Sequence, residues 1–284
     1  MRIPLSARLL STAAIGLALS FSGKGDERPR RGPTINDLSL EVVALQSLHQ
    51  FQFKPEQLQV LRTLSPETTM EAGARQAVKA SDEFQRTLAS LRTALADAGN
   101  AERIQELQEK MDKLRTAEKL ELDDSVEITE AALKRAPEIM KMLSARQIAG
   151  YVALYGDEFP DPLELLLEGL AKVRGLKDKE WEQLRQDVAE DVGNLTAGLD
   201  SEKAGQIGDQ VIQLLIRARA LKEPEFKKER ADLEKSAREI VGNIGALDVI
   251  RHVIERSLAE LLSNPRLPMA IDARIIFSQR GRSS

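Results

Sequence analysis

The two histidines, His49 and His252, are the side chains best suited to general acid–base chemistry near neutral pH. The chain contains no Cys, so a hydroxyl nucleophile activated by one of these histidines is the nucleophilic arrangement to consider. His49 follows Leu48 in a helical pattern, and His252 stands between Ile250 and Val253. Neither has a Ser-containing turn or a Gly-rich turn beside it. We interpret both as helix-face residues and predict no catalytic residue.

Acidic residues in two loops are the candidates for a metal site. Asp157, Glu158 and Asp161 offer carboxylate oxygens of the kind that calcium binds, but the segment lacks the Gly and the terminal Glu of a calcium-binding loop. Asp161 also fits the N-cap position of a helix. Asp123 and Asp124 lack a calcium-loop spacing in the same way. We therefore interpret these residues as solvated loop acids and predict no metal.

Met140 and Met142 offer sulfur ligands to soft metals. They lie next to Ile139 and Leu143 in an apolar stretch, which favours a role as core residues. No Gly-rich phosphate-binding motif occurs in the sequence, so a nucleotide enzyme is not expected. This inventory predicts no cofactor.

Charge argues against a nucleic-acid partner. The whole chain has 41 basic and 45 acidic side chains, and residues 1–33 hold six of the basic and two of the acidic ones. Residues 34–284 therefore carry 35 basic and 43 acidic groups, a poor match for a phosphate backbone. A helix-turn-helix interpretation of residues 147–152 fails, because the following residues 157–162 contain acids and prolines. We predict no nucleic-acid binding.

The elements that position these residues are predicted to be helices. From Asn36 onward, apolar residues recur at steps of three and four and almost never alternate. The pattern predicts an all-α fold, a multi-helix bundle of about ten helices. We expect two halves, residues 34–160 and 161–264, separated by the acidic, proline-containing loop 156–162. Residues 265–284 are expected to form a loosely ordered tail.

Prolines and caps mark the predicted helix ends. Pro55 suits a first helical turn, and Pro66 is expected to end the helix that starts there. Pro137 is expected to interrupt a weak helix, and Ser144 with Gln147 forms a capping box that opens the next one. The last strong apolar stripe consists of Leu247, Ile250, Ile254, Leu258 and Leu261.

Two neighbouring stripes predict an antiparallel helical hairpin. Residues 76–97 and 100–117 each carry apolar residues at steps of three and four, and a short Gly-Asn turn joins them. Their spacing is that of a short coiled coil. The residues expected to face one another across its seam are Leu88, Leu91, Leu107 and Met111.

The first residues have the layout of a secretory signal. Arg2 and Arg8 precede a mostly apolar stretch, residues 9–21, which is shorter than the roughly 20 residues that span a bilayer. We predict that residues 1–22 are a cleaved signal peptide and that residues 23–33 are a flexible basic tether. An exported chain without Cys fits the bacterial periplasm. No stable membrane span is expected after cleavage.

Two segments share one pattern at a predicted helix start. They are Phe53-Lys54-Pro55-Glu56-Gln57-Leu58 and Leu143-Ser144-Ala145-Arg146-Gln147-Ile148. Both resemble the Leu-Thr-x-x-Gln motif that occurs twice in the Spy-like periplasmic proteins, with Phe53 in place of Leu and with Lys54 and Ser144 in place of Thr. The resemblance implies an exported, all-helical chaperone or stress sensor, with Gln57 and Gln147 as structural motif residues. The same pattern of apolar residue, cap and Gln also serves simply to open a helix.

These observations predict an exported, non-enzymatic helical protein that binds a protein or an envelope component. The alternative is a helical enzyme whose carboxylates converge only in the fold. A deep pocket lined by several acids and a histidine would favour the enzyme, and a continuous apolar groove would favour binding. The sequence leaves the partner and the oligomeric state open.

Overall fold

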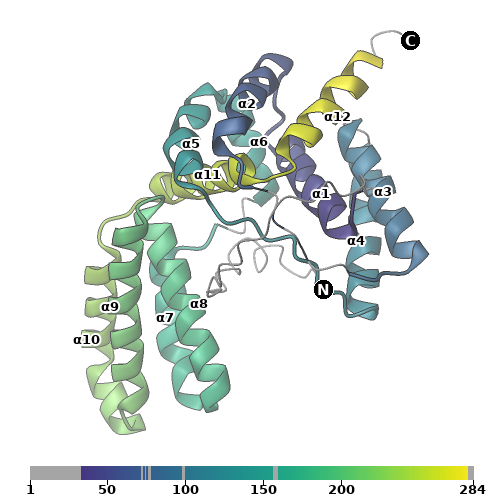
Figure 1. The fold of residues 1–284 in the computed structure, drawn as a ribbon. Helices are drawn as coiled ribbons and strands as arrows, with labels where there is room; N and C mark the ends of the chain where they lie inside the picture. Colours follow the sequence, from purple (N-terminus) through teal and green to yellow (C-terminus); the bar gives the residue numbers. More distant parts are fainter. Residues whose placement is uncertain are drawn as a thin grey trace, which may run out of the picture. The chain divides into compact units, whose positions relative to one another are not determined.

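The computed structural model describes residues 33–71, 73, 75, 78–97, 100–155 and 159–280. These residues form twelve α-helices and one short 3-10 helix, and none of them lies in a strand (Figure 1). The predicted all-α fold is confirmed. The chain divides into two compact units, which we call the mid-chain unit, Val152–Arg256, and the terminal unit, residues 33–151 and 257–280.

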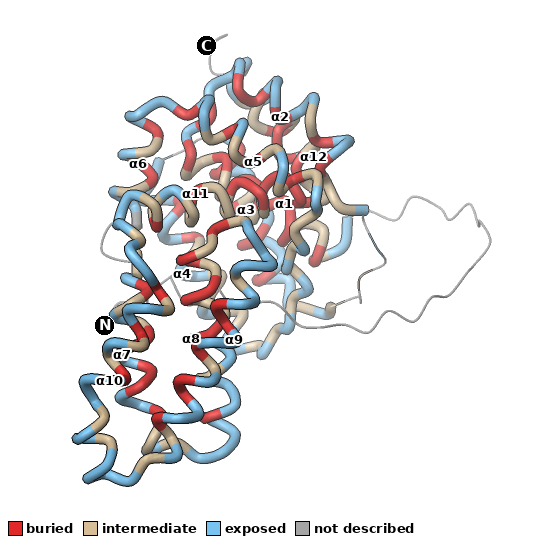
Figure 2. The backbone as a smooth tube through the Cα atoms, turned by 90° about the vertical axis from the view of Figure 1, so that its left-hand side faces the viewer, coloured by how far each residue is buried: buried red, intermediate tan, exposed pale blue. Residues whose placement is uncertain are grey.

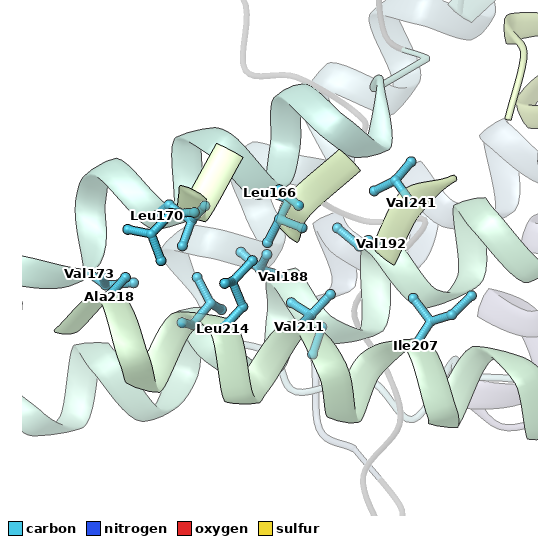
Figure 3. Packing of buried hydrophobic residues seen from close by; sticks show 14 of the residues in the cluster. Leu166, Leu170, Val173, Val188, Val192, Ile207, Val211, Leu214, Ala218 and Val241 are labelled. Atoms are coloured by element: carbon cyan, nitrogen blue, oxygen red, sulfur yellow. The ribbon is translucent and has the colours of Figure 1, made fainter. Parts of the chain in front are cut away.

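The mid-chain unit is a bundle of four helices in which α8 packs on α7 and α9, and α10 packs on α9 and α7 (Figure 1). Its elements are α7 (Pro162–Lys172), η2 (Val173–Gly175), α8 (Asp178–Ala197), α9 (Ser201–Ala220) and α10 (Glu223–Val241). Leu166, Val188 and Val211 are among the buried side chains that meet along the bundle axis (Figure 3). The one-sided apolar stripes of the sequence therefore form this core.

The terminal unit is assembled around α1, which contacts α3 and α12 and is buried along much of its length (Figure 2). Its helices are α1 (Ile35–Gln50), α2 (Pro55–Thr68), α3 (Asp82–Ala96), α4 (Ala101–Ala117), α5 (Glu130–Met142) and α12 (Leu267–Arg280). The unit boundaries fall within the two remaining helices, α6 (Ala145–Tyr155) and α11 (Ala246–Ser263).

The division of the chain differs from the expected two consecutive halves. The chain leaves the terminal unit after Tyr151 and returns to it at Ser257, so the last helices join the first ones. Helix α12 replaces the loosely ordered tail that we expected, and its Leu267, Ala270 and Ile271 are buried. This helix contacts α1, α2 and α3, so its apolar residues do not form the single stripe that marks a one-sided helix.

Helix α2 continues through Pro66 to Thr68, beyond the end that the proline predicts. Proline has no N–H for the carbonyl four residues earlier, which is that of Arg62. The hydroxyl of Ser65 donates to this carbonyl at 2.9 Å and satisfies it. Helix α5 likewise runs through Pro137 instead of being interrupted there.

The predicted hairpin corresponds to α3 and α4, which pack on each other. Helix α3 begins later than expected, at Asp82, because the Ser81 hydroxyl accepts a hydrogen bond from the Phe84 amide at 3.1 Å and caps it there. In the seam that we predicted, Leu88, Leu91 and Leu107 are buried and Met111 is half-buried.

Candidate functional site, a junction of two paired glutamines

The first glutamine motif opens α2. Pro55 occupies the first turn, where its missing N–H leaves no intrahelical bond unmade. The side-chain oxygen of Gln57 accepts a hydrogen bond from the Lys54 amide at 2.8 Å, which satisfies a donor just before the helix. Phe53, which replaces the motif leucine, is buried.

The second motif opens α6 with a complete capping box, as predicted. The side-chain oxygen of Gln147 accepts from the Ser144 amide and from the Ser144 hydroxyl, both at 3.0 Å. In return the Ser144 oxygen accepts from the Gln147 amide at 3.4 Å. Leu143 in front of it is buried.

The structure brings the two motifs together, although 90 residues separate their glutamines. The side-chain amide of Gln147 donates to the Gln57 oxygen at 3.0 Å and to the carbonyls of Phe51 and Gln52 at 3.0 and 3.2 Å. The side-chain amide of Gln57 donates to the Met142 carbonyl at 2.7 Å. Each glutamine therefore caps its own helix and binds the chain just before the other motif. Such a satisfied buried polar network fixes the register of the two helix starts.

Aromatic rings pack beside this junction. The rings of Phe51 and Tyr151 stack with centroids 4.5 Å apart, and Phe53 lies 5.6 Å from Phe51. The Tyr151 hydroxyl is within 2.9 Å of the Ser257 hydroxyl, which connects α6 to the part of α11 that belongs to the same unit. Burial raises the pKa of Tyr151 to about 12, so this phenol stays neutral at physiological pH.

Apolar side chains reach the surface at the same junction. Met142, whose carbonyl accepts from Gln57, is 38% exposed, and Val60, one turn beyond Gln57 on α2, is 36% exposed. We call these two side chains the junction edge. The prediction that Met140 and Met142 are both core residues is wrong for Met142, because it lies at the last position of α5.

The two histidines lie in different units and have different contacts. His252 on α11 places Nδ1 2.8 Å from the Leu195 carbonyl near the end of α8. Its ring fills the space beside Gly198, where an added Cβ would approach within 2.6 Å. His49 on α1 is half-buried, and its pKa is lowered by burial and by the charge of Arg274.

Of the acids in loop 156–162 that we considered as calcium ligands, the structure describes Asp161. Asp161 caps α7 by accepting from the amides of Leu163 and Glu164 at 2.8 and 3.4 Å, which confirms its predicted role. Asp157 and Glu158 lie outside the residues that the structure describes.

The acids of the second loop, Asp123 and Asp124, each form an ion pair with an arginine. Asp123 pairs with Arg75 at 2.7 Å. Asp124 pairs with Arg115 at 3.0 Å and accepts from the Ser39 hydroxyl at 3.0 Å. These contacts give both carboxylates a structural role.

Sequence reasoning missed a carboxylate cluster on α8. Burial raises the pKa of Asp191 to about 7, and the charges of Glu190 and Asp187 add to this effect while Arg256 opposes it. Arg256 also donates to the Asn194 side-chain oxygen at 2.9 Å. The spacing of Asp187, Asp191 and Asn194 by four and three residues places them on one helix face, and this was the available signal.

Within the described residues, no helix is long and apolar enough to cross a membrane, and no three His, Asp or Glu side chains are grouped to hold a metal ion. No family model matches the chain, and neither a curated protein sequence nor a solved structure matches it.

Proposed function

We propose that this protein is an exported, non-enzymatic helical protein that binds a protein or an envelope component, acting as a periplasmic chaperone or stress sensor. The observation that carries the proposal is the reciprocal pairing of Gln57 and Gln147. Two unrelated helix starts need only cap themselves. Here each motif also binds the chain before the other, so the two form one structural device.

This pairing gives weight to the resemblance between the two segments and the twin motifs of the Spy-like proteins. It makes both glutamines interdependent structural residues, which is the role that the resemblance implies for them. Chaperone or sensor activity in this chain is the proposal that follows from that likeness.

Exposed apolar side chains in the terminal unit supply a contact surface for such a function. Besides the junction edge, Met269 and Ile276 on α12 are 44% and 48% exposed. Apolar side chains of this kind hold a partner through burial of area. The excess of acidic groups in residues 34–284, 43 against 35 basic ones, favours solubility.

Suppression of aggregation tests the binding role. The full chain is mixed with two chemically unfolded test proteins, one acidic and one basic, and light scattering is followed. We expect less scattering with at least one of them, and a weaker effect for Val60→Asp with Met142→Asp. Gln59→Asp with Thr63→Asp changes exposed polar residues of α2 by the same charge and is the matched control. Unchanged scattering with both test proteins contradicts the proposal.

The export part of the proposal has its own test. Residues 1–22 lie outside the described residues, and the proposal rests on their sequence. N-terminal sequencing of the protein from the envelope fraction is expected to start near residue 23. A mature form that begins at Met1 would contradict cleavage.

A second candidate function is a helical enzyme that uses converging carboxylates. The observation that favours it is the cluster around Asp191, since a carboxyl group with a pKa near neutrality suits general acid–base catalysis. In a strain whose own copy of the gene is deleted, Asp191→Asn tests the carboxylate, and His252→Ala with His49→Ala tests histidine chemistry. A variant that no longer rescues the phenotype of this strain, although its helical circular dichroism is unchanged and its melting temperature is not lowered, would favour the enzyme.

A further inference from the structure

An open groove of about 590 Å3 runs between α3 and α4 in the terminal unit. Buried Leu107 of α4 contributes to its lining, and Ala89, Ser90 and Thr93 of α3 are short side chains along it. The hydroxyls of Ser90 and Thr93 donate to carbonyls of their own helix, at 2.8 and 3.0 Å. The short α3 side chains leave room for side chains of another molecule.

Two arginines line the groove together with these residues. Arg86 directs its Nε–H to the Asp82 carbonyl of its own helix at 3.1 Å. Arg103 pairs with the neighbouring Glu106 at 3.1 Å, and its side chain is 60% exposed. The described residues that line the groove include no carboxylate, although the chain as a whole is acidic. The groove therefore presents two guanidinium groups beside an apolar surface, and one of these groups, that of Arg103, is paired with Glu106.

The arginines lie toward opposite ends of the groove. The lining of α3 extends from Arg86 to Ala94, about 12 Å along the axis at 1.5 Å per residue. Because a short connection joins Ala96 to Ala101, Arg103 near the start of α4 lies toward the Ala94 end. Positive charge thus flanks an apolar middle.

We infer that this groove docks an extended, acidic segment of a partner protein with the pattern acid, any residue, apolar, any residue, acid. The inference rests on the proposed binding function and names the chemistry of its partner. In an extended chain alternate side chains point the same way, and four residues span about 13 Å. The two carboxylates of the segment meet Arg86 and Arg103. The apolar side chain between them packs against exposed Ala89, beside the 5% of Leu107 that remains exposed.

Labelled peptides test the inference with the full chain. A fluorescent peptide containing Glu-Ser-Leu-Ser-Glu is titrated and its anisotropy measured, with Lys-Ser-Leu-Ser-Lys as the control peptide. We expect the acidic peptide to bind more tightly by about tenfold, and Arg86→Glu with Arg103→Glu to remove that preference. Lys79→Glu with Lys113→Glu makes the same charge change at exposed sites outside the groove and is expected to keep it.

A second variant acts through shape instead of charge. Ala89→Trp fills the groove from an exposed position of α3 and is expected to weaken binding of the acidic peptide while the circular dichroism stays unchanged. Equal affinity for the two peptides, or full binding by the arginine variant or by Ala89→Trp, overturns the inference.

The aggregation assay separates this inference from the proposed function. In one outcome, the unmodified chain suppresses scattering while the groove variants bind the acidic peptide as tightly as it does. This result contradicts the docking inference and leaves the proposed function standing. Absence of suppression contradicts the proposed function, whatever the peptides do.

Discussion

The two helical hairpins of this protein, α3–α4 and α8–α9, show how the size of seam residues decides the surface that a hairpin offers. In α8–α9 the spacing Ala-x-x-x-Gly occurs on both helices, as Ala189 with Gly193 and as Ala204 with Gly208. A Cβ on Gly193 would lie 2.6 Å from the Ala204 carbonyl oxygen, and one on Gly208 would lie 3.3 Å from that of Ala189. The two backbones therefore touch.

The α3–α4 hairpin has larger seam residues and a different result. Leu88, Leu91 and Leu107 are buried, and a groove opens beside them. Helix α4 packs on α3, whereas α8 and α9 are each also covered by α7. Close backbone contact closes the α8–α9 seam, whereas in α3–α4 the short side chains of α3 beside the leucine seam leave a concavity at its edge.

The largest effect is expected from breaking the leucine seam. Leu107→Asp places a charge at a position that is 5% exposed, which is expected to destabilise the terminal unit by about 3 kcal/mol or more. Thermal melts followed by circular dichroism measure the change. An unchanged midpoint would mean that Leu107 does not hold α4 on α3.

The glycine seam is expected to be nearly as sensitive to a single methyl group. Gly193→Ala pushes its Cβ against backbone that has little freedom to move, and we expect a loss of about 2 kcal/mol. Gly205→Ala on α9 is the matched control, because no atom lies within 4 Å of its Cβ. The control is expected to stabilise the chain by up to about 1 kcal/mol through helix propensity. Destabilisation of equal size in both variants would refute the backbone-contact interpretation.

The glutamine junction extends the comparison to a polar contact between helices. Gln147→Leu leaves the carbonyl of Phe51 and the amide of Ser144 without this partner, and we expect a loss of about 1 to 3 kcal/mol. Urea denaturation measures it. Gln59→Leu, an exposed glutamine on α2, is the control and is expected to change stability little. A double variant, Gln57→Leu with Gln147→Leu, should lose less than the sum of the single losses if the two residues act together.

The smallest effect is expected for the pH dependence of stability that Asp191 on α8 causes. The pKa of Asp191 is raised from 3.8 to about 7, so between these values the folded chain binds a proton that the unfolded chain does not. Stability of the mid-chain unit is therefore expected to rise as pH falls from 8 toward 5. Asp191→Asn is expected to raise the melting temperature at pH 8 and to flatten this dependence. An unchanged slope of melting temperature against pH would show that other groups set it.

Periodicity predicted the helical fold because a helix that buries one face repeats its apolar residues every three or four positions. The caps at Asp161 and Ser144 were predictable for the same local reason. The pattern could not assign Leu247, which begins the last predicted stripe but is 83% exposed in the first turn of α11. A stripe shows which residues share a face and does not show how far the covering element extends.

Contacts between distant segments could not be predicted from the sequence. Nothing local indicates that Gln147 reaches the carbonyl of Phe51, or that burial raises the pKa of Asp191. Helix α12 was not predicted, because three helices contact it and its apolar residues do not form a single stripe. These features depend on which elements meet, and that is settled by packing across the whole unit.

Because the chain returns to the terminal unit at Ser257, this unit cannot complete its fold until the end of the chain has been synthesised. The side-chain amide of Asn264 donates to the carbonyl of Leu40 at 3.0 Å, across 224 positions of sequence. A ribosome that adds about 5 to 20 residues per second needs roughly 10 to 45 seconds to make that length of chain. Throughout this interval α1 lacks α12, whereas the mid-chain unit receives its last residue, Arg256, before α12 begins at Leu267. Helix α1 is therefore made early and fully covered late, and its buried face lacks part of its cover while the rest of the chain is being made.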